Sequence, residues 1–148
     1  LACEDPMTGL ASLAHVRSRL SELYRGELRL ATRVRDTHAL VVAELPQDRH
    51  VDPTDQRAKH VLTRAMRLSS LGDAARTVFA GTETIGKLGP ERIVVVAERD
   101  DRLGQRVALL RRMARTVQGG GESARVWIEG LPGTDATAAL LLDELASS

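Results

Sequence analysis

The first half of the chain alternates between helical and extended hydrophobic patterns. Leucine and valine side chains at three- and four-residue steps predict an amphipathic helix over about residues 12–25, with Ser12 as its N-cap. A compact apolar run over residues 38–45, ended by Pro46, predicts a buried strand. From about residue 53 to residue 79 the spacing returns to the helical period, so we expect a second helix there.

The second half of the chain predicts a hairpin and then three further elements. Two short runs rich in β-branched residues, 82–88 and 92–97, flank Gly89-Pro90-Glu91 and predict a tight hairpin. The remaining predicted elements are a helix opened by Asp100 and Asp101 and stopped by Gly119-Gly120-Gly121, a strand over 124–128 and a last helix from Asp135.

The order of these elements predicts an α+β fold. After a first helix the chain reads strand, helix, hairpin, helix and strand, and a last helix follows. The inner part is therefore a split βαβ unit with a ferredoxin-like βαββαβ core. We expect both crossover helices to pack on the same face of a mostly antiparallel sheet of four or more strands. At 148 residues the chain has the length of one domain.

Charge and cysteine content exclude several classes of function. Lys and Arg total 21 and Asp and Glu total 20, and the resulting net charge of +1 gives no field to attract nucleic acid. The single cysteine, Cys3, excludes an internal disulfide and a Cys-based zinc site. Without a signal sequence or a run of about 18 apolar residues, we expect a cytoplasmic domain that makes no direct membrane contact. Because the chain starts at Leu1 rather than Met, we expect a fragment of a longer multidomain protein, which could itself be membrane-anchored.

Two segments carry recognisable motifs. The first is Asp5-Pro6-Met7-Thr8-Gly9-Leu10, and the second is the stretch 87–93, which leads straight into Val94-Val95-Val96. Together they resemble the opening and the signature hairpin of the GGDEF family, the diguanylate cyclase domains. The resemblance covers essentially all of residues 1–148. It implies one GGDEF/nucleotide-cyclase-like domain, in which Asp5, Thr8 and Gly9 have a structural role before the first helix.

The first strand departs from the family pattern at its end. In active members this strand ends in a metal-binding Asp, and here Ala43 takes that position. Glu44 lies one step along and therefore points to the opposite face of the sheet. Glu44 is a candidate metal ligand only if the register slips by one residue, which would turn its apolar neighbours outward.

The hairpin departs from the pattern as well. It aligns as Gly89-Pro90-Glu91-Arg92-Ile93 against Gly-Gly-Asp-Glu-Phe. Glu91 takes the position of a metal-binding carboxylate, but Arg92 reverses the charge of the next residue and Pro90 stiffens the loop. Two-metal catalysis needs several carboxylates, so we interpret Glu91 as a solvated turn residue and predict neither a magnesium ion nor a bound GTP.

The two ligand sites of the family have no clear counterpart. Residues 46–64 lack the polar stretch that recognises guanine, and Ala80-Gly81-Thr82-Glu83 lacks the arginine that anchors cyclic di-GMP. Acidic and histidine side chains gather before the second helix without a recognised ligand spacing, and we interpret them as a solvated loop. They are Asp48, His50, Asp52, Asp55 and His60.

A basic stretch lies between the first helix and the first strand. It consists of Arg25, Arg29, Arg33 and Arg35. With acidic neighbours and no interleaved aromatic residues, it is interpreted as an exposed face, and a patch that binds phosphate or a partner stays open as the alternative. The run of three glycines that begins at Gly119 follows a helix, so it is predicted to be a loop rather than a phosphate cradle.

The sequence therefore predicts a degenerate, catalytically inactive GGDEF-like regulatory domain of a bacterial cyclic di-GMP signalling protein. We expect it to act through contact with other protein domains or with a homodimer partner. Two alternatives remain open. One is a nucleotide-sensing domain that binds GTP or cyclic di-GMP without turnover. The other is a divergent diguanylate cyclase that uses magnesium, Glu91 and Glu44.

Overall fold

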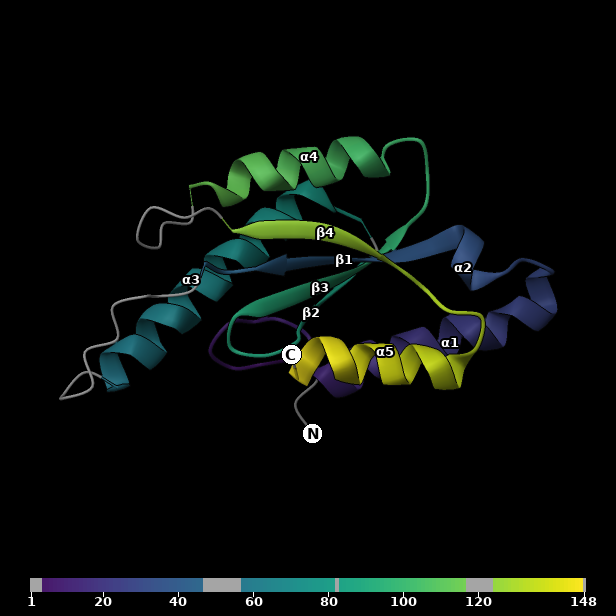
Figure 1. Ribbon diagram of the computed structural model, residues 1–148, viewed down its shortest axis with the longest axis horizontal. Helices are drawn as coiled ribbons and strands as arrows, with labels where there is room; N and C mark the ends of the chain where they lie inside the picture. The colour runs from purple at the N-terminus through teal and green to yellow at the C-terminus, as the bar shows by residue number, and fades with distance from the viewer. Residues whose placement is uncertain (1–3, 47–56, 82, 117–123, 148) are drawn as a thin grey trace.

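A four-stranded antiparallel sheet with helices on both faces forms the domain (Figure 1). The computed structural model describes residues 4–46, 57–81, 83–116 and 124–147. The helices are α1 (Leu13–Leu30), α2 (Val34–Thr37), α3 (Arg57–Val78), α4 (Leu103–Ala114) and α5 (Asp135–Ser147). The strands are β1 (His38–Glu44), β2 (Thr84–Lys87), β3 (Arg92–Glu98) and β4 (Arg125–Gly130).

The strand order is β2-β3-β1-β4, and every neighbouring pair is antiparallel. The predicted α+β class, the split βαβ order and the hairpin are therefore confirmed. Gly72 lies inside α3 and does not end it. Cys3, Thr82, the glycine run from Gly119 and the loop positions 48–55 lie outside the described residues.

The first helix is longer than expected, and a short helix that was not expected follows it. The first helix continues to Leu30 instead of ending near residue 25, and it closes at Ala31, whose φ of 53° is left-handed. Leu28 and Leu30 are exposed, which is why the apolar period did not indicate this last stretch. The one-turn helix α2 follows, and its first backbone N–H, at Val34, donates to the Glu27 carboxylate at 2.8 Å.

The sheet separates two apolar cores. Alternate residues of β1 point to opposite faces, as the two-residue period of a strand requires. Ala39, Val41 and Ala43 pack under α3 and α4, whereas Leu40 and Val42 pack against α1 and α5. All five are at most 1% exposed. The two crossover helices lie on one face, as predicted, and the first and last helices cover the other (Figure 1).

The segment before α1 is tied down by the opening motif. The Asp5 carboxylate accepts hydrogen bonds from the Thr8 amide at 3.0 Å and from the Thr8 hydroxyl at 2.6 Å. These bonds, with Lys87 nearby, hold the pKa of Asp5 below its ordinary value. Gly9 has a φ of 70°, which suits glycine. The structural role predicted for these residues is the one they take.

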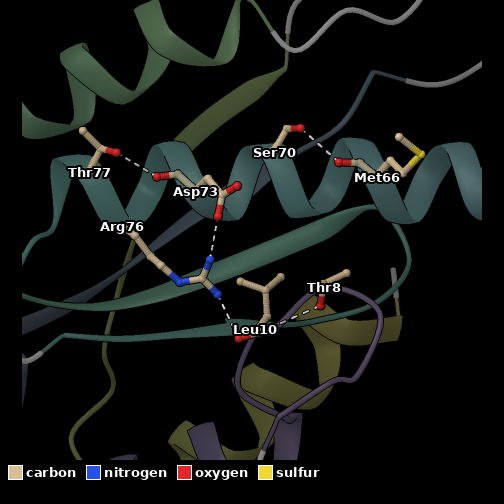
Figure 2. Close-up of polar contacts among 8 residues, drawn as sticks. Thr8, Leu10, Met66, Ser70, Asp73, Arg76 and Thr77 are labelled. Carbon is tan, nitrogen blue, oxygen red and sulfur yellow. Dashed lines mark hydrogen bonds and ion pairs between the residues drawn. The ribbon is translucent and has the colours of Figure 1, made fainter.

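The third helix holds the same segment from the other side. Arg76 of α3 donates to the Gly9 carbonyl at 2.8 Å and pairs with Asp73, one turn earlier, at 2.7 Å (Figure 2). The backbone of Ala11 then bonds along β2, since its N–H donates to Ile85 and its carbonyl accepts from Lys87. The segment before α1, residues 4–12, is called the entry segment below, and it covers the outer edge of β2.

Tyr24 provides a direct test of the packing between α1 and the loop before α5. It is the only tyrosine of the chain, it is 7% exposed, and its hydroxyl donates to the Pro132 carbonyl at 2.6 Å. Burial, with the charges of Glu27 and Asp135, raises the pKa of Tyr24 from 10.0 to about 12. Because the folded state favours the neutral phenol, Tyr24 makes its full contribution to the free energy of unfolding below pH 10. This contribution is lost as the pH rises towards 12.

We therefore expect the tyrosinate absorbance of the folded protein to rise with a midpoint well above pH 10, and the free energy of unfolding to fall over the same interval. The Tyr24→Phe variant should be about 1 kcal/mol less stable at neutral pH. Its stability should also fall much less at alkaline pH, because it has no phenol to ionise. An absorbance midpoint near pH 10 in a protein that is still folded would contradict this packing.

Candidate functional site

The turn between β2 and β3 is the part of the fold where the signature hairpin lies. Pairing continues up to the turn, because the Leu88 N–H donates to the Arg92 carbonyl at 3.0 Å. A pocket of about 290 Å³ opens beside it. Its lining residues come from the hairpin, the end of β1 and the end of α5, and they are Glu44, Leu88, Gly89, Pro90, Glu91, Arg92 and Ala146.

Arg92 lines this pocket and is bonded to β1 and to α5. Its Nε donates to Oε2 of Glu44 at 2.6 Å, and its Nη1 donates to the Leu145 carbonyl at 2.8 Å. The side chains of Arg92 and Glu44 are only 19% and 12% exposed. The positive charge that replaces a carboxylate in the hairpin thus joins β3 to β1 and to the last turn of α5.

The end of β1 has the orientation that the sequence predicted. Ala43 opposes Ile93 and lies in the core under α3 and α4. Glu44 opposes Arg92 and points to the other face. No register slip occurs, so the position of the family's metal-binding Asp is occupied by a methyl group in the core.

Glu91 is partly exposed, and it has a partner that the sequence did not indicate. Its carboxylate lies 3.6 Å from Nη1 of Arg64 on α3, and the two side chains are 34% and 38% exposed. Its backbone carbonyl accepts from the Leu45 N–H at 2.8 Å, which fixes the turn against the end of β1. At this exposure the ion pair contributes little stability, but it sets a cation beside the carboxylate.

The hairpin does not form a metal site with its surroundings. Within the described ranges, no group of three or more His, Cys, Asp or Glu side chains could hold a metal ion. Magnesium takes oxygen ligands in a near-octahedral arrangement and usually needs carboxylates free to approach it. Here one carboxylate, Glu44, already accepts from an arginine, and the other, Glu91, has an arginine next to it. The residues present therefore do not fit a magnesium ion beside a triphosphate.

A larger pocket of about 600 Å³ lies at the segment that the resemblance aligned with the family's product site. Ala80, Gly81 and Glu83 line it. Glu83 is 11% exposed and pairs with Arg106 of α4 at 3.4 Å. That guanidinium also lies 3.7 Å from Asp100. Arg106 is thus shared between two carboxylates. The arginine that lines this pocket, Arg76 of α3, is bonded to Asp73 and to the Gly9 carbonyl.

The basic stretch is exposed, as predicted, but Arg25 and Arg29 lie within α1 rather than after the first helix. The side chains of Arg25, Arg29, Arg33 and Arg35 all face solvent. In the described part of the chain, no helix is both long enough and apolar enough to cross a membrane.

Comparison with known proteins agrees with this fold. No protein-family model matches the chain, and no curated protein matches it. Two structures from Pseudomonas aeruginosa are similar to it. The diguanylate cyclase SiaD, solved in complex with its activator SiaC, superposes with a TM-score of 0.71 at 19% identity, over 98% of this chain and 56% of SiaD. The GGDEF domain of FimX superposes with a TM-score of 0.65 at 15% identity, over 99% of this chain and 94% of that domain.

The fold of the chain is therefore that of GGDEF domains. This confirms the fold that the resemblance of the opening motif and the hairpin implied. The chain spans just over half the length of SiaD.

Proposed function

We propose that this chain is a catalytically inactive GGDEF-like domain that regulates by contact with other protein domains or with a second copy of itself. The observation that supports this most directly is the pair of hydrogen bonds that Arg92 donates to Glu44 and Leu145. In the hairpin that would approach a nucleotide, this residue binds Glu44 and the carbonyl of Leu145 instead.

The second support is that both candidate metal ligands, Glu44 and Glu91, lie beside arginines. Phosphoryl transfer with two metal ions depends on carboxylates that hold both metals beside the triphosphate. Of the two candidates, Glu44 is turned away from the expected position and paired, and Glu91 lies beside Arg64. Pro90 adds a position with no N–H to donate to a phosphate. We derive no catalytic step through a metal or a nucleotide from this arrangement.

A contact role also fits one of the structural neighbours. SiaD has been solved in complex with its activator SiaC, so a protein that contains this fold forms a regulatory complex. As part of the same proposal, the domain belongs to a bacterial cyclic di-GMP signalling protein and works in the cytoplasm.

The test is a calorimetric titration of GTP with magnesium into the protein, followed by analysis of the mixture for cyclic di-GMP. We expect no heat of binding at millimolar GTP and no cyclic product. The Glu91→Ala variant and a matched variant at an exposed carboxylate outside the hairpin, Asp101→Ala, should both behave like the parent protein.

Two other outcomes would replace the proposal. Micromolar binding with formation of cyclic di-GMP, lost in Glu91→Ala and kept in Asp101→Ala, would establish a divergent cyclase. Saturable binding of GTP or cyclic di-GMP without product would establish a nucleotide sensor.

A further inference from the structure

The two edges of the sheet differ in how they are covered. The edge formed by β2 is covered by the entry segment, through the two backbone hydrogen bonds of Ala11. The edge formed by β4 has no neighbouring strand among the residues that the structure describes. An uncovered edge strand presents a row of backbone donors and acceptors that another strand can pair with.

The direction of the backbone groups on β4 follows from two independent hydrogen bonds. The Leu45 N–H donates to Glu91 on the β3 side of β1, so by alternation Val42 directs its backbone groups to β4. Val42 opposes Trp127, which therefore faces β1. The neighbours of Trp127 along β4, Val126 and Ile128, must then face outward. The Val126 carbonyl does so, because it accepts from Nε of Arg111 at 3.1 Å.

The side chains of β4 form a self-complementary row. Arg125, Trp127 and Glu129 share the face that is covered by α1 and α5. The Arg125 guanidinium lies 5.4 Å from the centroid of the Trp127 ring, and the Trp127 indole donates to Glu129 at 2.9 Å. A cation and an anion thus flank one aromatic ring at equal distances along the strand.

Reversing this row places each charge opposite its counter-charge. If two β4 strands run antiparallel about a two-fold axis at Trp127, Arg125 of one copy opposes Glu129 of the other. Val126 then opposes Ile128, and the backbone groups of both residues face outward. They form a hydrogen-bonded pair of the antiparallel ladder, and the Trp127 pair is a non-hydrogen-bonded one.

We propose that β4 is a self-association edge, along which two copies of this chain join their sheets into one of eight strands. The inference rests on the proposed contact function and names a second copy as the partner. The pairing also covers Ile128, which is 40% exposed in the single chain. Arg111 must release the Val126 carbonyl before the strands meet, so this bond opposes association.

The test is sedimentation velocity over a range of protein concentrations with two single charge reversals. In the Glu129→Arg variant two arginines oppose each other, and in Arg125→Glu two glutamates do. Cross-strand charge pairs contribute up to about 1 kcal/mol each and occur twice per dimer. Converting both from attractive to repulsive should weaken self-association about 30-fold.

A mixture of the two single variants is the decisive control. In a heterodimer of Glu129→Arg with Arg125→Glu every charge again faces its opposite, and association should return to near the parent level. The double variant that carries both reversals should also associate. The fluorescence of Trp127, the only tryptophan in the chain, should shift to shorter wavelength with association.

The Ile128→Pro variant tests the backbone pairing. Proline removes an N–H that faces outward, so the ladder to β1 keeps its bonds and the edge loses a donor. We expect this variant to be monomeric with an unchanged circular dichroism spectrum. Charge-reversed variants should likewise keep the spectrum of the parent protein.

The proposal is overturned if the parent protein is monomeric at millimolar concentration, or if it dimerises and neither charge reversal weakens the dimer. A monomer that binds no nucleotide would leave the contact function to a different partner. A β4-dependent dimer that makes cyclic di-GMP would overturn the proposed function and support this edge.

Discussion

The Arg92→Met variant is expected to lose about 3 kcal/mol of unfolding free energy, because it leaves a mostly buried carboxylate without its counter-charge. Glu44 is 12% exposed, and its carboxylate loses the 2.6 Å bond from Arg92. The Leu145 carbonyl loses its donor as well. For a chain of this size the melting temperature should fall by about 6–12 °C, as measured by thermal unfolding followed by circular dichroism.

Two controls separate the charge effect from the loss of side-chain packing. The double variant Glu44→Met/Arg92→Met removes both charges and should recover most of the lost stability, since apolar replacement of a buried pair is often neutral. An exposed arginine at the start of α4, Arg102, should tolerate Met within about 0.5 kcal/mol. A loss below about 1 kcal/mol for Arg92→Met would mean that Glu44 does not depend on the pair, and it would return Glu44 to the candidate metal ligands.

The Gly86→Ala variant should be about as damaging, for a steric reason. A Cβ at Gly86 would overlap Cγ2 of Val16 and would lie 3.2 Å from the carbonyl oxygen of Ala11. Val16 is fully buried and β-branched, and the Ala11 carbonyl is bonded to Lys87, so neither can move cheaply. We expect a loss of about 3 kcal/mol in urea unfolding, at the upper end of the usual cost of overpacking.

A second glycine gives the matched comparison. At Gly72 a Cβ would lie 2.6 Å from Cδ2 of Leu10, which is the end of a flexible side chain. Inside α3 the exchange of glycine for alanine also gains about 1 kcal/mol of helix propensity. Gly72→Ala should therefore change stability by less than about 1 kcal/mol. Equal losses at both positions would contradict the close approach of β2 to the entry segment.

The long elements of the fold could be predicted from the sequence because their patterns are local. The apolar run of β1 and the periodic leucines of α3 and α4 each carry their own signal. The one-turn helix α2 could not be predicted, because four residues are too few to show a period. Its start depends on Glu27, seven positions earlier, which binds Val34.

The chemistry of the hairpin could be predicted only in part. The residue types showed that carboxylates were missing and that Arg92 reversed a charge. The partners of those residues depend on strand register and on helix placement, which no local pattern encodes. Arg64 reaches Glu91 from α3, and Arg92 meets Glu44 and Leu145 from two other elements. For the same reason the sequence predicted a solvated Glu91 and did not indicate that Arg64 lies beside it.

The division of β1 between two cores has a consequence for how the sequence can drift. Val41 packs in the core under α3 and α4, and Val42 packs in the core under α1 and α5. A change of volume at one of them is compensated within its own layer, so adjacent positions accept substitutions independently. The side chains of each core can thus be substituted without disturbing the other core. This gives a physical reason why the backbone arrangement is kept although the identity to SiaD and to the FimX domain is only 19% and 15%.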